Sequence, residues 1–173
     1  MTRGNWFWSA CLVGLLAGRL TGGVARADDG SDTARVLGKL HRANQTEIDM
    51  GKMAQDHGTS KGVKDFGKML VRDHAAADKK VSKLAKDAKV DLKANTPPSD
   101  SHPDTIHTGA AFDNAFARNM LDDHEKDVAE VKAARDSTAD PRLKKLLTEL
   151  LPVLEKHKMT AQNLVAQAEK EKS

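Results

Sequence analysis

The chain has 173 residues, with 28 Lys and Arg against 25 Asp and Glu, a single cysteine and no tyrosine. The three basic residues in excess all lie within the first 27 residues, so the remainder carries 25 bases, 25 acids and a formal charge of zero. This balance argues against nucleic-acid binding. The single cysteine, Cys11, also lies in that first segment, which excludes a disulfide and thiol chemistry in the rest of the chain.

The first 27 residues have the pattern of a secretory signal peptide. Arg3 provides a positive charge, residues 6–18 form a run of 13 mostly apolar residues, and Ala25-Arg26-Ala27 places small residues at a cleavage site. Thirteen residues are too few to cross a bilayer as a helix, which needs about 20. We therefore expect cleavage, a periplasmic or secreted protein, and no transmembrane segment after processing. An uncleaved N-terminal anchor is the alternative.

The pattern of the remaining residues, 28–173, predicts one all-α domain. Apolar residues recur at spacings of three and four, and no stretch shows the alternation and β-branched content of a strand. The pattern predicts helices over about 33–57, 60–90, 110–136 and 141–168.

The connections indicate how these helices are arranged. Ser60 is placed to cap the second helix, and Asp140 followed by Pro141 marks the start of the fourth. The first and second helices are separated by only two or three residues, as are the third and fourth, so each pair should form an antiparallel hairpin. The proline-containing segment 91–109 is expected to be a longer loop between the hairpins. The sequence therefore predicts an antiparallel four-helix bundle.

Each predicted helix carries one potential metal ligand on its apolar stripe. These residues are Glu47, His74, His124 and His157. At 100° per residue, the stripe of the first helix is expected to pass through Val36, Leu40 and Ala43 before it reaches the glutamate. Heights counted from the hairpin turns at 1.5 Å per residue differ by roughly 10 Å. We therefore expect the four side chains to meet in one interior layer.

Such a layer needs partners for its polar groups. A buried polar group without a partner costs roughly 2–7 kcal/mol, against a total stability of about 5–15 kcal/mol for a domain. The four residues must bond to one another, bind a cation or occupy a wet cavity. Three imidazoles and one carboxylate suit one divalent ion, with zinc or iron favoured over manganese and copper. The alternative is a metal-free structural, stress-related or interaction module of the cell envelope.

Two further carboxylates lean toward the same face and are candidates to orient the imidazoles by hydrogen bonds. Asp78 follows His74 by four residues, and Asp127 follows His124 by three, although a surface charge is the favoured interpretation for Asp127. The other histidines are expected to be exposed to solvent: His41, His57, His102 and His107. The sequence contains no phosphate-binding glycine loop and no nucleophile elbow, so an enzyme is not favoured. A hydrolase or redox enzyme with an open metal position is the remaining alternative.

Four ordered motifs occupy residues 46–54, 63–74, 109–113 and 151–157. Together they resemble the domain-of-unknown-function family 4142, a family of exported bacterial proteins. The resemblance implies a ferritin-like four-helix fold and an exported location, but no established activity. It also implies one glutamate in the first helix and one histidine in each of the others, at the four positions given above.

The pattern differs from that of di-iron proteins, which carry Glu-x-x-His on two helices. The residues three positions before the histidines are Val71, Leu121 and Leu154. Ferroxidase or oxygenase chemistry at a carboxylate-bridged di-iron centre is therefore not supported.

Overall fold

The structure is a computed structural model that describes residues 30–95 and 108–170. Within these ranges there is no strand, which confirms the all-α class. The helices are α1 (Ser31–His57), α2 (Lys61–Asp87), α3 (Leu92–Asn95), α4 (Ala110–Ser137) and α5 (Pro141–Lys170). The predicted signal peptide, most of the predicted loop, His102 and His107 lie outside the described residues.

The starts of α2 and α5 are set by the capping residues expected from the sequence. The Ser60 hydroxyl accepts a hydrogen bond from the Val63 amide at 3.2 Å. The Asp140 carboxylate accepts one from the Arg142 amide at 2.8 Å, and Pro141 is the first residue of α5. Each cap satisfies a backbone donor that the first helical turn leaves without a partner.

The short helix α3 corrects the expectation of a continuous loop over 91–109. The second long helix ends at Asp87, earlier than predicted, and Lys89 turns the chain with a positive φ of 57°. The chain then packs α3 against α1. Gly38 permits this approach, because a Cβ atom at that position would overlap the backbone carbonyl of Asn95.

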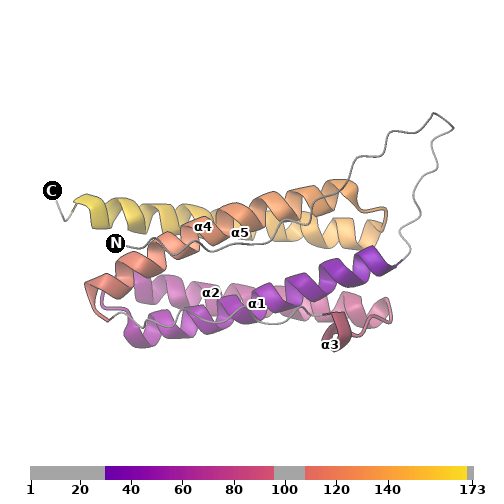
Figure 1. Ribbon diagram of the computed structural model, residues 1–173, viewed down its shortest axis with the longest axis horizontal. Coiled ribbons are helices and arrows are strands. Elements are labelled where there is room, and N and C mark those ends of the chain that lie inside the picture. The colour runs from indigo at the N-terminus through magenta and orange to yellow at the C-terminus, as the bar shows by residue number, and fades with distance from the viewer. Residues whose placement is uncertain (1–29, 96–107, 171–173) are drawn as a thin grey trace, which may run out of the picture.

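The four long helices lie side by side, with α1 packed along α2 and α4 packed along α5 (Figure 1). The two pairs meet mainly between α2 and α5. Two glycines lie in the α1–α2 contact. A Cβ atom on Gly51 would lie 2.7 Å from the Gly67 carbonyl oxygen, and one on Gly67 would lie 2.6 Å from that of Gly51. Only residues without a side chain allow the two backbones to approach this closely.

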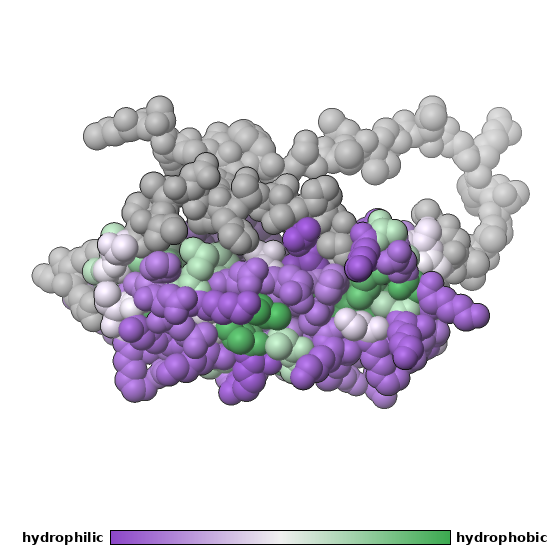
Figure 2. All heavy atoms as spheres, turned by 90° about the horizontal axis from the view of Figure 1, so that it is seen from below, coloured by the Kyte–Doolittle hydropathy of each residue, from purple (hydrophilic) through white to green (hydrophobic). Residues whose placement is uncertain are grey.

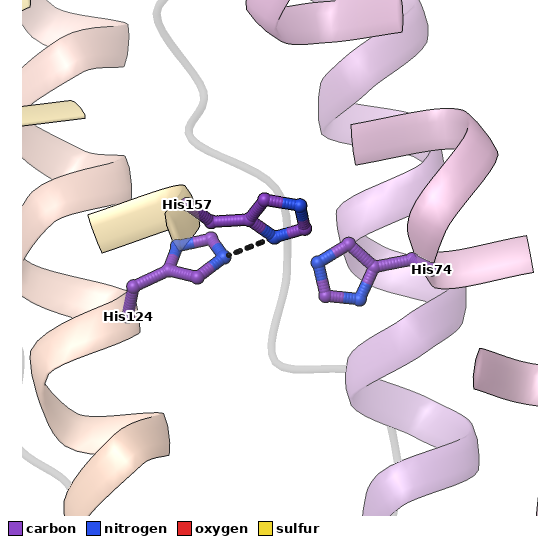
Figure 3. Close-up of side chains that lie close together, drawn as sticks. All are labelled: His74, His124 and His157. Atoms are coloured by element: carbon purple, nitrogen blue, oxygen red, sulfur yellow. Dashed lines mark hydrogen bonds between the residues drawn. The ribbon is translucent and has the colours of Figure 1, made fainter. Parts of the chain in front are cut away.

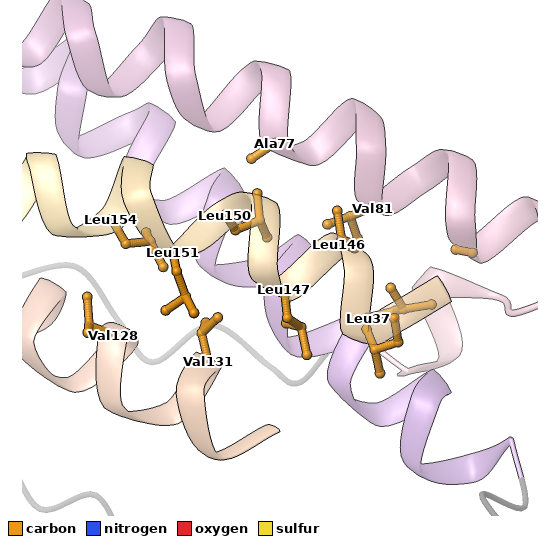
Figure 4. Packing of buried hydrophobic residues seen from close by; sticks show 12 residues of the cluster. Leu37, Ala77, Val81, Val128, Val131, Leu146, Leu147, Leu150, Leu151 and Leu154 are labelled. Atoms are coloured by element: carbon orange, nitrogen blue, oxygen red, sulfur yellow. The ribbon is translucent and has the colours of Figure 1, made fainter. Parts of the chain in front are cut away.

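Two apolar clusters fill the interior, one on each side of a layer of polar side chains. The first cluster is rich in leucine and valine from the α4–α5 turn end, including Leu37, Val81, Val131, Leu147 and Leu151 (Figure 4). The second contains Phe66, Phe112, Phe116 and Met120 near the α1–α2 turn. Along α2, Leu70 is the last residue of the second cluster and Ala77 is the first residue of the first cluster, and the buried His74 lies between them. The polar layer is thus enclosed by apolar packing.

The core-facing stripe of α1 differs from the prediction by one residue. Leu37 and Asn44 are buried, whereas Val36 and Ala43 are only half-buried, and Glu47 is buried as expected. Polar side chains cover most of the outer face of α1 and α2, with apolar side chains in small patches (Figure 2). In the part of the chain that the structure describes, no helix is long and apolar enough to cross a membrane.

Candidate metal centre

Three of the predicted ligands meet in the interior (Figure 3). His74 on α2, His124 on α4 and His157 on α5 are 3%, 0% and 0% exposed, respectively. One ring nitrogen from each histidine lies within 4.8 Å of the corresponding atoms of the other two. The helical spacing that predicted a common layer therefore brings these three imidazoles together.

The His124 ring is held by its own helix. Its Nδ1 atom lies 2.8 Å from the carbonyl oxygen of Met120, one turn earlier in α4. A carbonyl oxygen only accepts hydrogen bonds, so Nδ1 carries the hydrogen and donates it. In the neutral ring the lone pair is then on Nε2, which faces the other histidines.

The His157 ring is held by a carboxylate from another helix. Its Nε2 atom donates to the Asp73 carboxylate of α2 at 3.1 Å. Arg72 fixes that carboxylate from outside, with its Nε and Nη2 atoms donating at 2.7 Å and 3.0 Å. Since Nε2 carries the hydrogen, the lone pair of the neutral His157 ring is on Nδ1.

The His74 ring is held by an amide from α1. Its Nδ1 atom donates to the Asn44 side-chain oxygen at 3.0 Å. Its Nε2 atom is one of three buried side-chain atoms without a hydrogen-bond partner within residues 30–95 and 108–170; the others are Asn44 Nδ2 and Glu47 Oε2. All three histidines therefore bond to an acceptor through one nitrogen and keep a lone pair on the other.

The two nearest inward nitrogens are spaced as two ligands of one metal would be. His124 Nε2 lies 3.2 Å from His157 Nδ1, the contact drawn in Figure 3. Two imidazole nitrogens bound tetrahedrally at 2.0–2.1 Å from one zinc ion would be about 3.3 Å apart. With a lone pair on each atom and no cation between them, the two nitrogens would repel each other.

Burial keeps these rings neutral, the form in which histidine binds metals. Loss of solvent lowers the pKa of His74 to about 3, with smaller contributions from charge on His157 and His124. Loss of solvent also lowers the pKa of His124 to about 4, and charge on His157 lowers it further. Burial also lowers the pKa of His157, and the hydrogen bond to Asp73 opposes that shift.

One side of the three histidines is closed by an aromatic ring. The centroid of the Phe66 ring lies 6.0 Å from that of His157 and 6.4 Å from that of His124. Phe66 is buried and packs in turn on Phe116, with their centroids 5.9 Å apart. This apolar wall excludes water on that side and strengthens the electrostatic interactions of any bound ion.

Glu47, the fourth predicted ligand, is buried but is not part of the group that the three histidines form. Burial raises its pKa well above the usual value, and the negative charges of Asp127 and Asp123 on α4 raise it further. Both effects favour the protonated, neutral form of the carboxyl group. Its Oε2 atom, also without a hydrogen-bond partner, remains free to bind a cation.

The two carboxylates expected to orient the imidazoles have different environments. Asp78 lies against α1, where its oxygens bond His41 Nδ1 at 2.7 Å and Gln45 Nε2 at 2.9 Å. Asn44 takes the place beside His74 that was expected for Asp78. The half-buried His41 is likewise not the solvated residue that was predicted. Asp127 is half-buried, and loss of solvent together with neighbouring Asp123 raises its pKa to about 7.

The sequence reasoning misses both residues that bond the histidines from other helices. Asn44 lies three residues before Glu47, on the same helical face, and this spacing is a signal that could have identified it. Asp73 directly precedes His74 in the chain, but its partner is on α5. No spacing within one helix indicates such a pair.

Comparisons with known proteins agree with this structure. The family described as "Domain of unknown function (DUF4142)" matches residues 21–164. A comparison with curated proteins finds no match. Among solved structures, the chain is similar to one described as "CopM in the Cu(I)-bound form", with 18% sequence identity and a TM-score of 0.63 over 78% of this chain and 96% of that chain. Identity this low supports a similar fold alone. Because the family match spans most of the chain and agrees with the motifs, the chain belongs to the DUF4142 family.

Proposed function

We propose that this protein binds one transition-metal ion through His74, His124 and His157. The ion would lie inside an antiparallel, ferritin-like four-helix bundle, and the protein would hold or carry the metal instead of catalysing a reaction. One observation carries the proposal: an acceptor holds the outer nitrogen of each ring, and the inner lone pairs converge. Outer hydrogen bonds of this kind are typical of metal-binding histidines, because they fix the tautomer and orient the ring.

The metal-free alternative accounts less well for the same geometry. A proton shared between His124 and His157 would create a buried imidazolium, yet burial lowers the pKa of both rings. Such a proton would also leave the Nε2 atom of His74 without a partner. An unsatisfied buried group of this kind costs about 1–3 kcal/mol.

Copper(I) is the ion we propose first. Imidazole nitrogens bind copper, zinc, iron and nickel. The three neutral rings supply no negative charge, and the nearby Asp73 carboxylate acts only through its bond to His157. A monovalent ion therefore leaves the least uncompensated charge in a buried site. The fold similarity to CopM in its Cu(I)-bound form also favours copper. Zinc and iron, which the sequence favours, would be favoured by a negatively charged ligand such as Glu47, whose pKa burial raises.

We also propose that the protein is exported, as the signal-peptide pattern of residues 1–27 predicts. The described residues begin after that segment, so the proposal stands on the sequence. Amino-terminal sequencing of the protein from fractionated cells tests it. A mature chain beginning at Asp28 in an exported fraction is expected, and a full-length chain in the cytoplasm would contradict it.

Metal content and anaerobic titration of the purified protein test the metal proposal. We expect one Cu(I) per chain, tighter binding of Cu(I) than of zinc or iron, and loss of binding in His74→Ala and His124→Ala. His41→Ala is the matched control, because His41 also bonds a carboxylate but lies outside the group of three. A wild-type protein that takes up none of these ions would contradict the proposal.

A further inference from the structure

A cavity of about 80 Å³ lies between the four long helices beside the histidines. Its mouth includes the exposed residues Lys39 and Glu130, whereas Asn44 and His74 in its lining are buried. Because a single water needs roughly 10–15 Å³ of such space, the cavity has room for several waters or a partly hydrated ion. It therefore connects the protein surface to the site.

The charge of this lining favours cations. Three carboxyl groups, those of Asp73, Asp127 and Glu130, line the cavity, against the single ammonium group of Lys39. Asp73 is paired with Arg72, and Asp127 has a pKa of about 7, so Glu130 and the ionised form of Asp127 supply the unpaired negative charge. A recess with low-dielectric walls and one predominant sign of charge concentrates ions of the opposite sign. Cations are therefore attracted to the opening, and anions are repelled.

One of the three histidines lines the buried part of the cavity. This residue is His74, which is only 3% exposed. Its Nε2 atom has no hydrogen-bond partner. His124 and His157 do not line it, and Phe66 packs beside both of them. A cation that moves inward from the carboxylates therefore reaches His74 before the other two histidines.

We propose that this cavity is the route of metal uptake, in which Glu130 and Asp127 draw the cation inward and His74 is the first imidazole to bind it. The proposal rests on the metal-binding function given above and adds a path and an order of binding. Small side chains keep the path open, since Ala43 and Ala77 line the same cavity.

The rate of metal loading tests this route. The apo-protein is mixed rapidly with Cu(I) or Zn(II), whichever binds at equilibrium, and uptake is stopped at intervals with excess chelator. Above pH 7, where Asp127 is mostly ionised, we expect Glu130→Gln and Asp127→Asn each to slow loading by about threefold to tenfold at low salt, with a smaller effect at high salt. Glu125→Gln is the control, because it removes the same charge from an exposed site on α4 that does not line the cavity.

A second pair of variants tests the path without changing charge. Ala43→Leu narrows the cavity and is expected to slow loading at least tenfold while the final metal content stays at one ion per chain. Ala129→Leu adds the same volume at an exposed position of α4 and should load at the wild-type rate. Loading at the wild-type rate in Glu130→Gln, Asp127→Asn and Ala43→Leu, with normal binding by the wild type, would overturn the uptake route. A wild type that binds no ion would instead overturn the metal-binding function.

Discussion

The Nε2 atom of His124 lies 3.2 Å from the Nδ1 atom of His157, and both rings have their other nitrogen bonded to an acceptor. The outer bonds come from the Met120 carbonyl and the Asp73 carboxylate. They fix the direction of both inner lone pairs before any ion arrives. A site organised in advance loses little conformational entropy on binding, which favours tight binding from few ligands.

The first prediction concerns the carboxylate behind His157. In Asp73→Asn the amide oxygen can still accept the hydrogen bond, but the negative charge that makes the ring more basic is lost. Changes to such outer partners typically weaken metal binding 10–100-fold. We expect a loss of about tenfold or more in Cu(I) affinity, measured by competition with a chelator.

The control for that variant is Asp78→Asn. Asp78 also bonds a histidine on another helix, but this histidine is His41, outside the site. Wild-type affinity is expected for this variant. Equal losses in the two variants would show that Asp73 acts through general stability and not through His157.

The second prediction concerns Glu47, whose pKa is raised by burial and by the nearby charges of Asp127 and Asp123. If it joins the site only for a divalent ion, Glu47→Gln should weaken zinc binding about tenfold or more and leave Cu(I) binding within about twofold. Binding of zinc to the wild type should also release a proton, because a carboxylate ligand must be deprotonated. Calorimetry in buffers of different ionisation enthalpy measures that proton. Release of the same proton when zinc binds to Glu47→Gln would exclude Glu47 as its source.

The sequence predicts most of the fold because the long helices are specified locally. Caps such as Ser60 and Asp140 lie beside the helices they begin. Helix α3 could not be predicted in this way, since its four residues are about one turn and too few to show a helical period. It depends on packing against α1 near Gly38, which is a contact between distant parts of the chain.

The part of the site that depends on position within a single helix was also predictable. The three histidines share the 3.6-residue period of their helices, and that period places them in the interior. The rotation of α1 did not follow from its apolar residues alone, because the face that is buried carries Asn44 and Gly51 as well as Leu37. That rotation buries Asn44 in place of Ala43 and supplies the partner of His74.

The third prediction is the pH dependence of stability in the metal-free protein. The folded pKa values of about 3 for His74 and about 4 for His124 lie below the value of about 6.5 for an unfolded chain. The unfolded chain therefore binds more protons below about pH 6.5, so these residues reduce stability as the pH falls from about 6.5 toward 4. Asp127 has the opposite effect, because its raised pKa of about 7 makes the folded protein bind more protons and gain stability as the pH falls over the same range.

Comparison with a variant separates these opposing contributions. His74→Gln lacks the titrating ring but retains Asp127 and Glu47. Urea unfolding at pH 7, 6 and 5 should show the wild type losing stability relative to this variant with each step. Parallel pH profiles for the two proteins would mean that His74 is not held neutral by burial.

The last prediction concerns the contact that orients α1. In Gly67→Ala the new methyl group would lie 2.6 Å from the Gly51 carbonyl oxygen and 2.8 Å from the Ala54 Cβ atom. Because backbone and a short side chain cannot move aside easily, the helices must separate, and we expect a loss of about 1–3 kcal/mol in the free energy of unfolding. Displacement of α1 should also weaken the bond between Asn44 and His74 and lower metal affinity.

Gly62→Ala provides the matched control, since its new methyl group would meet only the tip of the flexible Leu164 side chain. At this helical position alanine gains up to about 1 kcal/mol of helix propensity over glycine, so stability should be unchanged or higher. Urea unfolding and Cu(I) competition on both variants give the two readouts. If Gly67→Ala matched Gly62→Ala in both, the α1–α2 glycine contact would not be what positions Asn44 behind the site.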